Sequence, residues 1–174
     1  MASITFVAPI VRAAIATLKA ELPDAIASYN AQDENDVILA EPTEYVFGAA
    51  DPLVLTAGPL LEVASTDGQL SEFSIRRSEG DHDPRVSVVC WHEGERGELS
   101  PTYEMSLGLA RCVIEVLARD GAFGAEVEIS NAPGAISWRT DVIPADPVAG
   151  GREFLKWQVP VLVSFQLETV ERFV

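Results

Sequence analysis

The 174-residue sequence has few basic residues, few histidines and few cysteines. Its 12 Lys and Arg stand against 27 Asp and Glu, which gives a formal net charge of −15. Affinity for nucleic acid or for an anionic membrane needs clustered Lys and Arg, so the charge argues against both classes of partner. The charge is still compatible with a surface past which DNA slides without sticking, because like charges repel. The two cysteines, Cys90 and Cys112, are too few for a disulfide framework.

The sequence also lacks the short motifs that announce catalysis or phosphate binding. It contains no G-x-S-x-G nucleophile elbow, no G-x-G-x-x-G or G-x-x-x-x-G-K-[ST] loop, and no C-x-x-C pair of zinc ligands. We therefore expect no enzyme, no cofactor and no bound metal. The apolar N-terminal segment is interrupted by Arg12 and Lys19 and has no basic start, so we expect a mature cytoplasmic sequence without a membrane span.

Two segments have helical periodicity. The first covers residues 9–22, and Pro23 is expected to end it. The second follows Ser100 as its cap and Pro101 as its first helical residue, and it ends before Gly121. Its apolar arc is broad, which predicts that this helix lies against a sheet.

Strand patterns occupy most of the remaining chain. The valines of segment 85–91 and its Trp91 put apolar groups on both faces, which is typical of a central strand. Pro160 cannot donate to a ladder and predicts an edge position or a bulge. The order α-β-β-β-α-β-β-β predicts an α+β fold, with a single mixed or antiparallel sheet packed against two main helices in one domain, 1–174. The predicted extended pieces are 45–47, 53–55, 60–64, 71–77, 85–91, 125–129, 135–142 and 155–169, and 92–100 and 144–153 are predicted exposed loops.

The stretch RVSVVCWHEGERGE, residues 85–98, places a Cys, a Trp and a His together. Cys90 and His92 would share one face of a strand, and with Cys112, His82 or Asp83 they could form the site of a small metal-dependent hydrolase. The alternative is that both cysteines are small buried hydrophobic residues, since each falls on an apolar face. His92 would then mark the point where the strand meets solvent.

Four segments carry a resemblance to a known family: LPDAIASYNA, EPTEYVFGAADPL, RVSVVCWHEGERGELSPTYEMSLGLARCVIEVLARDG and KWQVPVLVSFQLETVERF. Their arrangement resembles the tail-terminator and related head–tail joining proteins of long-tailed bacteriophages. The resemblance implies a virion structural protein, made in the host cytoplasm, that assembles into a homo-oligomeric ring, commonly a hexamer. Such a ring caps the tail tube, stops its polymerisation and forms the joining surface for the head. The alternative within this class is a head-side connector or completion protein of the neck.

The resemblance also implies partners and contacts. The partners would be copies of the same chain, the tail tube protein and a head-side connector protein, while DNA passes through the ring without specific binding. An acidic lumen would suit that passage. Each of the three tryptophans is expected either in the core or at a subunit interface, where Trp is enriched. The candidate subunit or tail-tube contacts are Trp91, Glu93, Glu95, Arg96, Arg152, Phe154 and Trp157.

Overall fold

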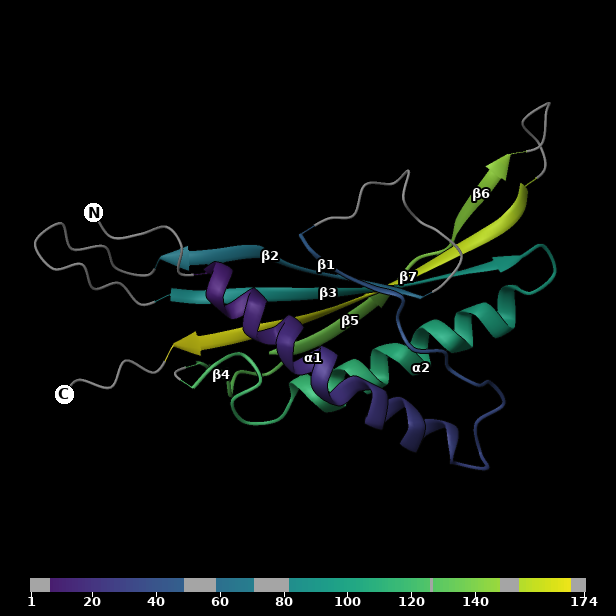
Figure 1. Cartoon of the computed structure of the whole chain (residues 1–174). Coiled ribbons are helices and arrows are strands. Elements are labelled where there is room, and N and C mark those ends of the chain that lie inside the picture. Colours follow the sequence, from purple (N-terminus) through teal and green to yellow (C-terminus); the bar gives the residue numbers. More distant parts are fainter. Residues whose placement is uncertain (1–6, 49–58, 71–81, 126, 148–153, 170–174) are drawn as a thin grey trace, which may run out of the picture.

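A computed structural model describes residues 7–48, 59–70, 82–125, 127–147 and 154–169 (Figure 1). Within these residues the chain forms two helices and one mixed sheet of seven strands, which confirms the predicted α+β class. The predicted strands at 53–55 and 71–77 lie outside the described residues. The elements in chain order are α1 (Val7–Asn30), β1 (Glu44–Phe47), β2 (Leu60–Leu70), β3 (His82–Glu95), α2 (Leu99–Leu117), β4 (Val127–Ile129), β5 (Ile136–Thr140), β6 (Ile143–Pro147) and β7 (Phe154–Thr169).

The sheet is built around the long antiparallel pair β3 and β7 (Figure 1). On one side of this pair, β2 is antiparallel to β3 and β1 is parallel to β2. On the other side, the short strands β4, β5 and β6 each pair with a successive part of β7. The predicted central position of segment 85–91 is confirmed, because β3 pairs with β2 and β7 at once.

Two predicted loops are shorter than expected. The segment predicted as an exposed loop from residue 92 begins as four more residues of β3, since His92–Glu95 pair with Lys156–Val159 of β7. The segment predicted as a loop from residue 144 begins as β6, which gives one strand more than expected after α2. Both errors have the same cause. The N-terminal end of β7 pairs with the end of β3 and with β6, although the sequences of these two segments have low β-propensity.

Pro160 is not at an edge, because β7 pairs on both sides. Its carbonyl accepts a hydrogen bond from the N–H of Asp141 at 3.1 Å. The amide nitrogen and carbonyl of one residue in an antiparallel strand point to the same neighbour, so the missing N–H of Pro160 faces the gap between β5 and β6. The proline therefore costs no ladder hydrogen bond in a central strand.

Both helices lie on one face of the sheet. The helix α1 packs on β1, β2 and α2, and α2 packs on β3 and β7. We call the face beneath them the helix-covered face and the opposite face the helix-free face. The fully buried strand residues all belong to the helix-covered face: Leu61, Val63, Val86, Val88, Cys90, Val159, Val161, Val163, Phe165 and Leu167.

The ends of the helices differ from the prediction. The helix α1 continues through Pro23 to Asn30 because Ala25 and Ile26 are buried beyond the proline. Their packing offsets the roughly 3 kcal/mol that an interior proline costs. The helix α2 begins at Leu99 rather than after Ser100, and Thr102 donates its hydroxyl to the carbonyl of Glu98 at 2.6 Å.

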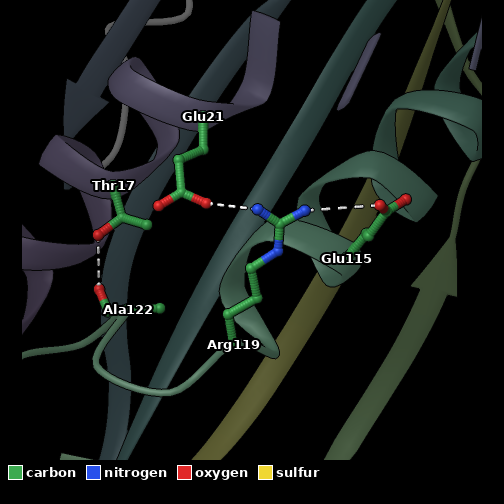
Figure 2. Close-up of polar contacts among 5 residues, drawn as sticks. All are labelled: Thr17, Glu21, Glu115, Arg119 and Ala122. Atoms are coloured by element: carbon green, nitrogen blue, oxygen red, sulfur yellow. Dashed lines mark hydrogen bonds and ion pairs between the residues drawn. The ribbon is translucent and has the colours of Figure 1, made fainter. Parts of the chain in front are cut away.

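One arginine ties the two helices together near the end of α2. Figure 2 shows the guanidinium of Arg119 between two carboxylates, 2.7 Å from Glu21 of α1 and 3.6 Å from Glu115 of α2. Beside it, Thr17 of α1 donates to the carbonyl of Ala122 at 3.0 Å. These contacts connect α1 to the turn that follows α2.

Candidate functional site

The helix-free face carries the candidates Trp91 and Glu93 near its centre. Trp91 is half-buried, lies opposite Pro160 of β7, and has an indole N–H without an acceptor among the described residues. A depression of about 550 Å³ opens beside it, lined by Val89, Trp91, Arg139, Thr140, Asp141, Pro160 and Leu162. The centre of this face is therefore partly accessible, with the apolar Val89, Trp91, Pro160 and Leu162 beside the polar Arg139, Thr140 and Asp141.

Glu93 lies in a small polar cluster between β3 and β7. Its carboxylate is 2.7 Å from the ammonium of Lys156 and accepts a hydrogen bond from the amide of Gln158 at 3.3 Å. The carboxylate is only 19% exposed, so the pair is shielded from water more than a surface ion pair is. This predicted contact residue already has partners within its own chain.

The remaining candidates are spread over both faces and the adjoining turn. Glu95 is exposed on the last residue of β3, and Arg96 is exposed in the turn before α2, where its N–H donates to the carbonyl of Leu155 at 2.8 Å. Trp157 is half-buried and pairs with Gly94, which places it on the helix-covered face and not with Trp91.

Two further candidates cannot be placed as contacts. Arg152 lies outside the described residues. Phe154 is the first residue of β7, and the structure describes its backbone but not its side chain. The candidates that the structure describes do not gather into one patch, because Trp91 and Glu93 lie on the helix-free face and Trp157 on the opposite one.

Four exposed apolar side chains are spread along the outer edge of the sheet, three on the helix-covered face and Ile143 on the helix-free face. Trp138 of β5 is 59% exposed and Leu155 of β7 is 52% exposed, and Ile136 and Ile143 are also exposed. The prediction had Trp138 as either core or interface, and its exposure excludes the core. The alternation of apolar residues could not predict this exposure. Ile136 and Trp138 do lie on the helix-covered face, but at a part of it that the helices do not cover. We call these four residues the apolar edge.

The cysteines are buried as predicted. Cys90 and Cys112 are both free thiols in the core, 0% and 1% exposed. Burial is the main cause that raises the pKa of Cys112 to about 11, and burial also raises the pKa of Cys90. Both sulfurs are therefore protonated at neutral pH, which leaves them unreactive as nucleophiles.

His92 is not where the strand meets solvent. It is 6% exposed, beneath the start of α2, and neither ring nitrogen has a hydrogen-bond partner in the part of the chain that the structure describes. Burial lowers its pKa to about 4, so the ring is neutral at pH 7. The prediction was wrong because β3 continues beyond His92 and carries it under the helix.

The alternative metal site would combine Cys90, His92 and Cys112 with His82 or Asp83. His82 precedes Cys90 by eight residues of one strand, which separates their Cα atoms by roughly 26 Å at the usual rise per residue. Among the described residues, no three His, Cys, Asp or Glu side chains converge on a point that could hold a metal ion. The strand geometry thus separates the pair Cys90 and His92 from the pair His82 and Asp83.

No described helix combines the length and the apolar character needed to cross a membrane. No model of a known protein family matches the sequence, and a search of curated proteins finds no match.

Proposed function

We propose that this chain is a ring-forming structural subunit of a long-tailed bacteriophage, of the tail-terminator type. The ring caps the tail tube, halts its polymerisation and offers a surface to the head. The observation that carries this proposal is the apolar edge, where an exposed Trp138 is accompanied by exposed Ile136, Ile143 and Leu155. Ile136 and Trp138 lie two residues apart on one face of β5, while Ile143 faces the opposite side and Leu155 lies ten residues along β7 from the partner of Ile136. The edge is therefore a line of exposed apolar groups with Trp138 and Ile136 at one end, and an exposed apolar pair at a sheet edge is a candidate contact with a neighbour.

The position of the apolar edge suits a ring. It lies on β5, β6 and the start of β7, on the opposite side of the sheet from the edge strand β1 (Figure 1). A contact made by this edge with a different part of the next subunit is heterologous, and heterologous contacts form closed rings when the rotation between subunits closes. Tryptophan is the residue type most enriched among the residues that dominate binding energy at interfaces.

The charge supports the passage of DNA. With a net charge of −15, a ring of several such chains is strongly acidic and does not hold the genome by its phosphates. The proposal requires that acidic residues line the lumen. A ring structure with a neutral or positive lumen would count against the passage of DNA through it.

The test is assembly in the presence of tail tubes. Native mass measurement and negative-stain imaging of the protein with purified tubes should show closed rings at tube ends and arrested tube growth. A Trp138→Glu variant should fold normally by circular dichroism yet fail to form rings, while Ala20→Glu on the exposed side of α1 should assemble as the wild type does.

Two outcomes separate this proposal from the alternatives. A protein that stays monomeric both alone and with tubes contradicts the terminator function. Rings that ignore tubes but bind a head-side connector would instead support the neck completion protein.

A further inference from the structure

The loop that follows α1 presents one apolar side chain to solvent. Ile38 is 80% exposed, more than any other large hydrophobic side chain among the described residues. Its neighbours point the other way, since Leu39 is 3% exposed and Val37 packs against the core. Ile38 is thus held outward by the burial of the residues on either side of it.

Side-chain hydrogen bonds fix this loop. The carboxamide of Asn30 accepts from the N–H of Leu39 at 2.8 Å and donates to its carbonyl at 2.9 Å. Asn35 donates to the carbonyl of Tyr29 at 2.6 Å. A loop held in this way presents Ile38 without a large entropic cost on binding, because its conformation is already set.

The surroundings of Ile38 are acidic. Residues 31–43 contain four acids and no basic residue. All four are exposed: Asp33, Glu34, Asp36 and Glu41. The loop therefore combines an apolar anchor with a negative rim, and we call it the Ile38 loop.

The depression on the helix-free face offers apolar walls and one exposed cation. Val89, Pro160 and Leu162 supply apolar walls. Arg139 at the rim is exposed and has no carboxylate partner among the described residues, and the indole N–H of Trp91 has no acceptor there. Asp141 is the one acid at the rim, and its carboxylate accepts a hydrogen bond from the N–H of Val142 at 2.8 Å.

We propose that the Ile38 loop of one copy of this chain docks into the Trp91 depression of the next copy. Ile38 meets the apolar walls, and the acids of the loop face Arg139. The loop follows α1 on the helical side of the sheet (Figure 1). The depression is lined by Val89, Trp91 and Leu162 of the helix-free face, so the contact joins unlike surfaces of two copies. This inference rests on the proposed ring and names a contact that would build it.

Cysteine cross-linking tests the contact directly. An Ile38→Cys chain mixed with a Leu162→Cys chain should form an intermolecular disulfide under mild oxidation. Under the same conditions, neither variant alone should form a disulfide-linked dimer. The native Cys90 and Cys112 are buried and do not compete. A matched control replaces Ile38→Cys with Ser28→Cys, an exposed position on α1, which should not cross-link to Leu162→Cys.

A charge exchange provides a second test. Arg139→Glu should weaken self-association roughly tenfold, which corresponds to the loss of one rim contact, and adding Asp36→Arg to the same chain should restore most of it. Ser28→Glu should leave self-association unchanged. No loss in Arg139→Glu, or no recovery in the double variant, overturns the inference.

The outcomes distinguish this contact from the ring itself. Rings that form without the cross-link between positions 38 and 162 overturn the contact and leave the proposed function standing. The cross-link in open filaments supports the contact and contradicts the ring. Monomers without cross-links overturn both.

Discussion

Two sets of side chains alternate along β7 and have opposite environments. On the helix-covered face, Val163 and Phe165 are fully buried, while Leu162 and Ser164 beside them are half-exposed on the helix-free face. The helix-covered face accounts for most of the buried core, and the helix-free face has an apolar centre that nothing in the described chain covers fully. Residues of the helix-covered face therefore stabilise the fold, whereas apolar residues at the centre of the helix-free face are partly exposed.

The largest expected difference in stability is between two apolar residues of β7 that lie on opposite faces, Phe165 and Leu162. Phe165→Ala should lower the free energy of unfolding by about 3–5 kcal/mol, because it empties a packed site whose ring centroid lies 5.4 Å from that of Phe123. Leu162→Ala should cost about 1 kcal/mol, because its side chain is only partly removed from water. Urea unfolding of the two variants measures both values. Equal losses would contradict the division between the faces.

The second prediction uses the buried His92 of the helix-covered face. Burial lowers its pKa from the ordinary 6.5 to about 4, so the unfolded chain takes up the proton first as the pH falls. Stability should be complete above pH 6.5 and should fall by about 3 kcal/mol between pH 6.5 and 4 on account of this residue alone.

Comparison with a His92→Leu variant isolates this effect from the titrating carboxylates. The difference in unfolding free energy between the wild type and the variant should change over that pH range and stay constant above it. Parallel curves for the two proteins would show that His92 is not buried in a neutral form.

The third prediction concerns the close approach of β3 to α2. A Cβ atom on Gly94 would lie 1.8 Å from the hydroxyl oxygen of Thr102, so Gly94→Ala should cost about 1–3 kcal/mol. Adding Thr102→Ala removes that oxygen and should recover part of the loss. Thermal unfolding of the single and double variants checks this, and additive losses would contradict a steric cause.

The smallest effect is expected at the outer surface of the helical layer. Arg119→Gln should lower the free energy of unfolding by about 0.5 kcal/mol, because its ion pairs with Glu21 and Glu115 are exposed to water and screened by salt. Chemical unfolding at low and high salt measures it. A loss above about 2 kcal/mol would mean that these pairs hold the helices more strongly than surface pairs usually do.

Most of the fold could be predicted from periodicity. The two helices and most of the strands have clear patterns, and Cys90, Cys112 and the buried residues of β7 fall on the predicted faces. The ends of elements could not be predicted, because tertiary packing decided them. Burial of Ile26 carried α1 past Pro23, and pairing with β7 extended β3 past His92.

The contact surfaces were harder to predict than the fold. Trp91, Glu93 and Glu95 do lie on the helix-free face, yet the exposure of Trp138 and Ile38 was not visible in the sequence. Exposure depends on how far the helices reach over the sheet and on how a loop is tied, and neither is local. A pattern of residue classes gives the face of a strand but not what covers that face.

The gap between β5 and β6 has a consequence for the motion of the sheet. The two strands share β7 but form separate ladders, and Pro160 lies where one ladder ends and the other begins. Separation of β6 from β7 therefore breaks no hydrogen bond between β5 and β7. The strand β6 can thus have its own local unfolding equilibrium. A chain built in this way can change the shape of this edge while its core remains folded.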